Sequence, residues 1–105
     1  MIKIEIMYLD SYKNQISSLC KEHNVKHLFA FGSVLTSKFS DESDVDLLVD
    51  IKSKDPLIYA EHYFDLKFKL EDLLSRKIDL LEERAIKNRY LMENINNSKQ
   101  LIYGA

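Results

Sequence analysis

Hydrophobic and polar residues change their spacing along the chain, and these changes predict alternating helices and strands. Apolar residues recur at helical spacing up to about His23, and Asp10 or Ser11 is a suitable N-cap for that helix. The run 25–31 is rich enough in apolar residues to predict a strand buried on both faces, and Gly32 ends it. The chain therefore begins with a helix followed by a strand.

The later part of the chain repeats this change of period. Asp55-Pro56 marks a helix start, because proline at the first helical position loses no hydrogen bond. The further elements expected are an edge strand at 2–6, a helical turn at 33–37, a strand at 45–51, a helix to about Ser75, a strand at 77–82, a helix from Ala85 or Asn88 to about Ser98 with Leu91 and Ile95 inward, and an edge strand at 100–103.

This order predicts one α+β domain over residues 1–105, an α/β sandwich with a small mixed β-sheet and flanking helices. The first two strands are joined by a short loop and should be antiparallel, whereas the long helix before 77–82 implies a parallel, right-handed crossover. With this pairing, the end of the first strand and the starts of the next two meet at one edge. Four polar side chains converge there: Ser33, Asp44, Asp46 and Asp79.

Composition restricts the function classes. A formal net charge of −2 gives no sign of a general nucleic-acid binder, so no direct nucleic-acid partner is expected. Cys20 is the single cysteine, which excludes an intramolecular disulfide framework and fits a reducing cytoplasm. We find neither a signal peptide nor an apolar run of the roughly 20 residues that a membrane span needs. The expectation is a soluble, cytoplasmic protein with no membrane partner.

Asp44 and Asp46 lie two residues apart at the start of a buried strand, so their side chains share one face, with Cα atoms about 6.6 Å apart. Together with Asp79 in the next strand, these two residues offer the carboxylate oxygens that Mg²⁺ prefers as ligands. Three acids around two metal ions are an arrangement suited to phosphoryl or nucleotidyl transfer. Asp79, away from the pair, is the candidate general base. A DxD pattern alone is more often a loop or cap; its position beside a third acid favours the metal site.

Gly32-Ser33 follows the buried strand directly, so the backbone can approach a phosphate there and the serine adds a hydroxyl. The chain has no P-loop motif, and two glycines in total cannot make one. Outside this stretch, ordinary interpretations are favoured. Asp50 is expected on the solvated surface. Lys38, Arg76 and Lys77 could assist a triphosphate, but a solvated surface position is favoured for them, and the three histidines show no ligand spacing.

Gly32-Ser33, ten residues, and Asp44-Val45-Asp46 together resemble the signature of the DNA polymerase β-like nucleotidyltransferase superfamily. With the short length and the third acid in KIDLL, the chain is most similar to the minimal nucleotidyltransferases, the MNT proteins. The resemblance implies that Gly32 and Ser33 hold nucleotide phosphates and that Asp44, Asp46 and Asp79 are catalytic and bind Mg²⁺.

The resemblance also implies a reaction and a partner. Many MNT proteins are antitoxins that transfer AMP from ATP to a tyrosine of a HEPN ribonuclease toxin. Val34 and Thr36 stand where arginines are frequent in the family, and Ser37 stands where glycine is frequent. These departures leave open which nucleotide the protein prefers. Two alternatives also stay open. One is an antitoxin that neutralises its partner by contact alone. The other is an enzyme that modifies a small molecule, which is less favoured because 105 residues leave no second domain to form an acceptor pocket.

Overall fold

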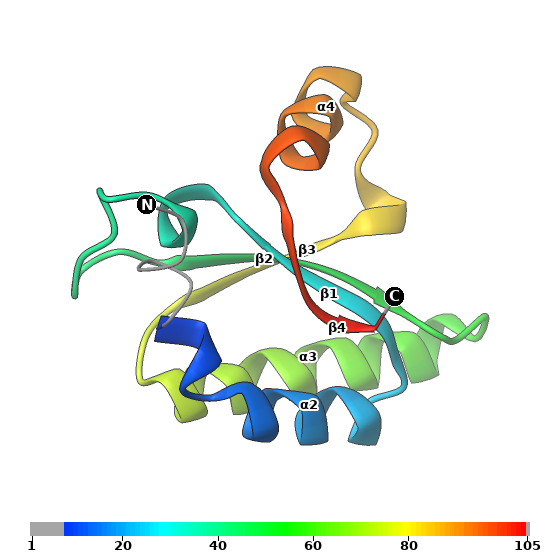
Figure 1. Cartoon of the computed structure of the whole chain (residues 1–105). Coiled ribbons are helices and arrows are strands. Elements are labelled where there is room, and N and C mark those ends of the chain that lie inside the picture. Colours follow the sequence, from blue (N-terminus) through cyan, green and yellow to red (C-terminus); the bar gives the residue numbers. More distant parts are fainter. Residues whose placement is uncertain (1–7, 105) are drawn as a thin grey trace.

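The computed structural model describes residues 8–104, and the expected edge strand at 2–6 lies outside them. Its elements follow the predicted order (Figure 1). They are α2 (Lys13–Glu22), β1 (Val25–Phe31), the 3-10 turn η1 (Gly32–Leu35), β2 (Val45–Ile51), α3 (Pro56–Leu74), β3 (Ile78–Glu82), the 3-10 turn η2 (Glu83–Ala85), α4 (Arg89–Ser98) and β4 (Gln100–Gly104).

The four strands form one mixed sheet in the order β3-β2-β1-β4. β1 pairs antiparallel with β2 and with β4, while β2 and β3 are parallel and joined through α3. Both predicted pairings are therefore confirmed, and so is the edge strand at the C-terminal end. The mixed sheet with flanking helices confirms the predicted fold class.

Helices cover the two faces of the sheet unequally. α2 and α3 pack together against one face, and α4 stands over the other (Figure 1). The main hydrophobic core lies on the α2–α3 side, where β-strand residues such as Leu28, Leu47 and Leu80 meet Leu66 and Leu70 of α3. Leu48 and Ile95 are also buried but lie outside that cluster. The sheet face under α4 is thus only partly covered; we call it the open face.

Two helix starts differ in how they are capped. The Asp55 side chain accepts hydrogen bonds from the backbone N–H groups of Leu57 and Ile58, which confirms the predicted N-cap of α3. The prediction of Asp10 or Ser11 as the cap of the first helix is wrong. α2 begins at Lys13, and its N-cap residue Tyr12 makes no side-chain capping bond.

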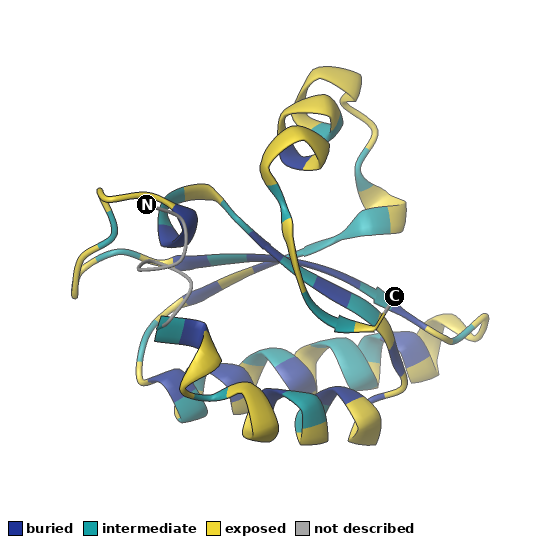
Figure 2. Cartoon of the chain, in the orientation of Figure 1, coloured by how far each residue is buried: buried dark blue, intermediate teal, exposed yellow. Residues whose placement is uncertain are grey.

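Burial on the helices is one-sided. Ile95 of α4 is buried as expected, but Leu91, which was also expected to point inward, is 42% exposed. α3 has buried and exposed sides (Figure 2), and Phe64 and Phe68 are exposed. A helix resting on one sheet can bury only one of its sides, so these two rings remain outside.

Candidate active site

The predicted site residues meet at one end of the open face. Phe31 of β1 is the register partner of Asp46 in β2, and Asp46 is in turn the partner of Asp79 in β3. Because side chains alternate along a strand, Asp44 lies on the same side as Asp46, just before β2 begins. We call Asp44, Asp46 and Asp79 the acidic end of the sheet. The structure thus brings together the three carboxylates that the sequence predicted to converge.

Gly32 lies directly against the Asp46 carboxylate. Its φ of +74° is a backbone conformation that favours glycine. A Cβ atom at this position would collide with Oδ2 of Asp46 and would come within 3.3 Å of its Cγ. Glycine is therefore required here for two reasons, the positive φ and the approach of the acid to the backbone.

Ser33 follows within η1, the short turn that the sequence predicted one residue later. Its carbonyl accepts hydrogen bonds from the backbone N–H and the hydroxyl of Thr36, at 2.9 and 3.0 Å, which close the turn. Val34 is fully buried in the core and Thr36 is exposed. Val34, at the first of the two positions where the family often has arginine, thus anchors the turn in the core. Neither Val34 nor Thr36 gives the turn a basic side chain.

The three acids differ in exposure. Asp44 and Asp79 are exposed and Asp46 is half-buried. Burial, then the neighbouring charge of Asp79, then that of Asp44, raise the pKa of Asp46 above its ordinary value. The acids therefore lie near enough to repel one another, and a bound cation would relieve that repulsion. Lys77 gives little compensation, because its ammonium is 3.9 Å from Asp44 and 73% exposed.

Arg76 is a residue of this region that the sequence interpretation missed. Its Nη1 donates to the carbonyls of Ser40 and Ser43, at 2.9 and 2.7 Å, so it holds the loop that leads into Asp44. The guanidinium also lies over the rings of Tyr8 and Phe39, 4.7 and 4.6 Å from their centroids. The predicted solvated surface position is wrong for Arg76. No motif signalled this role, because the contact spans 33 residues of sequence.

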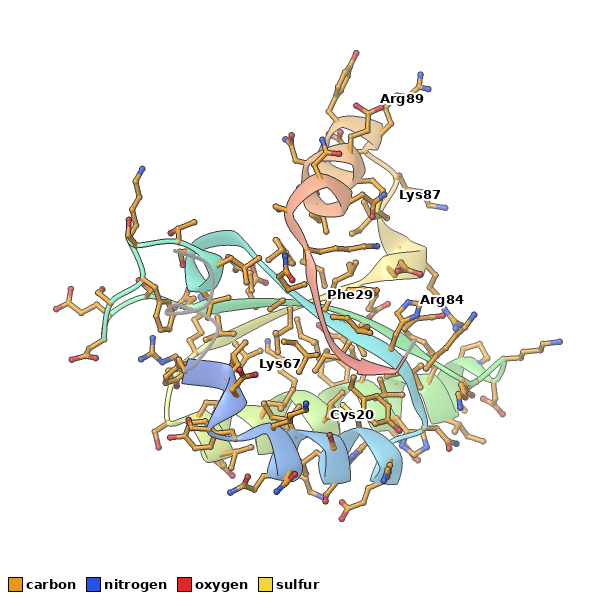
Figure 3. The ribbon with its side chains drawn as sticks, in the orientation of Figure 1. Cys20, Phe29, Lys67, Arg84, Lys87 and Arg89 are labelled. Atoms are coloured by element: carbon orange, nitrogen blue, oxygen red, sulfur yellow. The ribbon has the colours of Figure 1, made fainter. Side chains whose placement is uncertain are left out.

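The opposite end of the open face carries a second set of charged residues. His27 is the register partner of Asp50, and its Nε2 lies 3.0 Å from Oε2 of Glu83. Asp50 is paired with Arg84 at 2.8 Å and is 15% exposed, so its predicted solvated position is also wrong. We call His27, Asp50, Glu83 and Arg84 the paired end. Figure 3 shows Arg84 at the end of the sheet away from η1, with Phe29 between the two ends.

Within residues 8–104, the group of three potential metal ligands whose donor atoms all lie within 4.8 Å of one another is His27, Asp50 and Glu83. The acidic end does not form so compact a group. At the paired end, however, Arg84 already neutralises Asp50, and His27 lies at hydrogen-bond distance from Glu83. The adjoining hollow is lined by Lys26, Lys52 and Lys54 among others. At the acidic end the donors are carboxylates with little positive charge near them, which suits a divalent cation better.

Comparison with known proteins agrees with this fold. A solved structure described provisionally as a minimal nucleotidyltransferase superposes with a TM-score of 0.74 at 28% identity, covering 90% of this chain and 93% of that one. An MNT antitoxin complex with a tri-AMPylated HEPN toxin of Shewanella oneidensis shares the fold, with a TM-score of 0.62 at 19% identity over 100% of this chain and 74% of that chain.

Sequence comparison identifies the family of the chain as well as its fold. A protein of Methanocaldococcus jannaschii with the provisional name protein adenylyltransferase is 34% identical over 85 residues, 81% of this chain and 82% of the relative. The family model described as "Polymerase beta, Nucleotidyltransferase" matches residues 14–105. The chain belongs to this nucleotidyltransferase family, and the prediction of a nucleotidyltransferase enzyme is confirmed. In the part of the chain that the structure describes, no helix has the length and apolar character to cross a membrane.

Proposed function

We propose that this protein transfers AMP from ATP to a tyrosine of a partner HEPN-domain ribonuclease and thereby acts as its antitoxin. The observation that carries the proposal is the acidic end: Asp46 and Asp79 side by side in register, with Gly32 against Asp46. The provisional name of the M. jannaschii relative and the AMPylated toxin in the S. oneidensis complex support the choice of acceptor.

Asp44, Asp46 and Asp79 would hold Mg²⁺, with two ions expected from the number of acids. Bound Mg²⁺ would supply positive charge beside the triphosphate. The raised pKa of Asp46 fits such a site, because a carboxylate held near other carboxylates gains most from a cation. Gly32 and Ser33 would lie against the phosphates, since Gly32 has no side chain to keep them away from the backbone.

The reaction needs a proton acceptor and an aligned nucleophile. The tyrosine oxygen attacks the α-phosphorus of ATP in line, its bond to phosphorus forms, and the bond from phosphorus to the β-phosphate oxygen breaks. The phenolic proton passes to Asp79, which is exposed and so accessible to an incoming hydroxyl, and pyrophosphate leaves. Positioning and charge neutralisation supply most of the rate.

One observation favours a second candidate, an antitoxin that acts by contact alone. The turn after Gly32 provides no basic group at positions 34 and 36, since Val34 is in the core and Thr36 is a neutral residue. A site with few positive charges beside the triphosphate would bind nucleotide weakly. An antitoxin that acts by contact alone would not need to bind nucleotide.

The test separates the two candidates. The protein, a HEPN ribonuclease encoded beside it, Mg²⁺ and ATP labelled at the α-phosphate are incubated together, and label on the ribonuclease is followed by mass spectrometry. Asp46→Asn removes a proposed metal ligand, and Asp50→Asn is the matched control, because Asp50 lies on the same strand and face at the paired end.

We expect transfer of AMP by the wild-type protein and by Asp50→Asn, and none by Asp46→Asn. The ribonuclease should stay active with Asp46→Asn. Complete neutralisation of the ribonuclease by Asp46→Asn, without label in any sample, would contradict the enzymatic proposal and favour neutralisation by contact.

A further inference from the structure

Among residues 8–104, the side chain that hydrogen-bonds to the loop between η1 and β2 from outside it is Arg76. Arg76 donates from a single nitrogen to the carbonyls of Ser40 and Ser43, and Ser43 is the residue before Asp44. Within the loop, Ser43 N–H also donates to the Ser40 carbonyl at 3.1 Å. The loop is otherwise largely exposed (Figure 2), so these bonds determine where it turns into β2.

The guanidinium is itself held in place. It lies over both the Tyr8 and the Phe39 ring, and those two rings are themselves in contact, with centroids 5.2 Å apart. The Tyr8 hydroxyl donates to the carbonyl of Leu74, at the end of α3. Both aromatic residues pack against the hydrophobic core. Arg76 therefore connects the loop to the hydrophobic core. Its planar guanidinium can contact the aromatic rings and donate hydrogen bonds to the loop carbonyls at the same time.

We propose that Arg76 is a positioning residue for the divalent-ion site, which it controls by fixing Asp44 through the Ser43 carbonyl. This inference rests on the proposed function, because it assumes an ion at the acidic end. The role is geometric. Arg76 does not contact Asp44 in the structure, and it is absent from the groups that perturb the pKa of Asp46. Outer-shell groups that orient metal ligands commonly change ion affinity about 10-fold to 100-fold when removed.

The chain offers a matched control in Arg84. Its guanidinium donates to the carbonyls of Ile51 and Ser53 at the other end of β2 and lies 4.6 Å from the centroid of the Tyr59 ring. Arg84 thus holds the loop that leaves β2 much as Arg76 holds the loop that enters it. Removing either arginine should lower stability, but only Arg76 is linked to a predicted ion ligand.

The experiment measures Mn²⁺ affinity, thermal stability and amide hydrogen exchange for the wild-type protein, Arg76→Ala, Arg76→Lys and Arg84→Ala. We expect Arg76→Ala to weaken Mn²⁺ binding about 10-fold or more and to speed exchange at the amides of Ser43 and Val45. Arg76→Lys should resemble it, because an ammonium keeps the charge but not the stacked, planar donor. Arg84→Ala should lower the melting temperature without weakening Mn²⁺ binding.

Three results would overturn the inference: unchanged Mn²⁺ affinity in Arg76→Ala, full recovery by lysine, or an equal loss in Arg84→Ala, which would reduce the effect to general destabilisation. The proposed function fails separately. If the wild-type protein binds Mn²⁺ but transfers no AMP, the reaction is wrong, while affinity and exchange still decide the role of Arg76. If the wild-type protein binds no Mn²⁺, both are wrong.

Discussion

The two ends of the open face carry similar acids in different surroundings. At the paired end, Asp50 is bonded to Arg84 and Glu83 is bonded to His27. At the acidic end, Asp46 has other acids as its neighbours, and the cation nearest to Asp44 is the exposed Lys77. The ends are about 13 Å apart along β2, since Asp50 comes four positions after Asp46.

This difference indicates which carboxylates lower the stability of the folded protein when no cation is bound. A half-buried acid that is paired with an arginine contributes to folding, or at least costs little. A half-buried acid beside other acids raises the free energy of the folded state until a cation arrives. The compact group of ligand atoms at the paired end is therefore the weaker candidate for a metal site, in spite of its closer spacing.

The largest effect is expected from Gly32→Ala. The added Cβ would displace the Asp46 carboxylate and would strain a backbone at φ +74°, so AMP transfer should fall about 100-fold or more. A steady-state transfer assay and Mn²⁺ titration measure this. Wild-type activity in Gly32→Ala would mean that AMP transfer does not depend on the present position of the Asp46 carboxylate.

Asp50→Asn and Asp46→Asn should change stability in opposite directions without metal. Asp50→Asn weakens two hydrogen bonds from Arg84, at a cost of about 1 kcal/mol because the arginine is half-exposed. Asp46→Asn removes a repelled charge and should raise the melting temperature by a few degrees at most. Thermal unfolding in EDTA at neutral pH compares the two, and a loss of stability in both variants would contradict the difference between the ends.

The gain from Asp46→Asn should depend on pH. The pKa of Asp46 is raised in the folded protein, so wild-type stability is lost as the pH rises through that pKa, where Asp46 becomes charged. Below it, Asp46 is protonated and resembles asparagine, and the two proteins should converge. Unfolding curves from pH 7 downward test this; a difference that stays constant with pH would rule out the charge of Asp46 as its cause.

Adding a divalent ion should reverse the order at neutral pH. Mn²⁺ binds the folded state and so stabilises the wild-type protein, whereas Asp46→Asn lacks a ligand and should gain little. The same melting experiment with Mn²⁺ in place of EDTA shows it. Equal stabilisation of both proteins would place the ion away from Asp46.

The smallest effect is expected from Lys77→Met. The ammonium is 73% exposed and 3.9 Å from Asp44, so its removal should change the free energy of unfolding by no more than about 0.5 kcal/mol. Chemical denaturation is sensitive enough to show this. A loss as large as that of Asp50→Asn would mean that the acidic end is compensated after all.

The strands of the sheet could be predicted from the sequence because local signals bound them. β1 and β2 begin and end at the predicted residues, since apolar runs stop at Gly32 and at the polar loop before Val45. Their pairing followed from the lengths of the connections, and with it the convergence of Asp46 and Asp79. The spacing of the acids along one strand was sufficient to predict that Asp44 shares a face with Asp46 at this end.

The charged contacts between distant residues could not be predicted in the same way. Arg76 and Arg84 both reach carbonyl groups more than 30 positions earlier in the chain, and no periodicity marks such contacts. The predicted cap of α2 is wrong for a different reason. Asp10 and Ser11 are suitable caps by residue type, but residues 8–10 are themselves helical, and a turn at 11–12 separates them from α2, which begins at Lys13. Residue type alone does not fix the point where a helix starts.

The most direct test of the central claim is where a divalent ion binds. Mn²⁺ is titrated into isotope-labelled protein, and amide signals that broaden first are assigned by NMR. We predict broadening at Gly32, Ser33, Asp44, Asp46 and Asp79, with His27 and Glu83 still sharp. Broadening that begins at His27, Asp50 and Glu83 and leaves Gly32 and Asp46 unaffected would contradict the account.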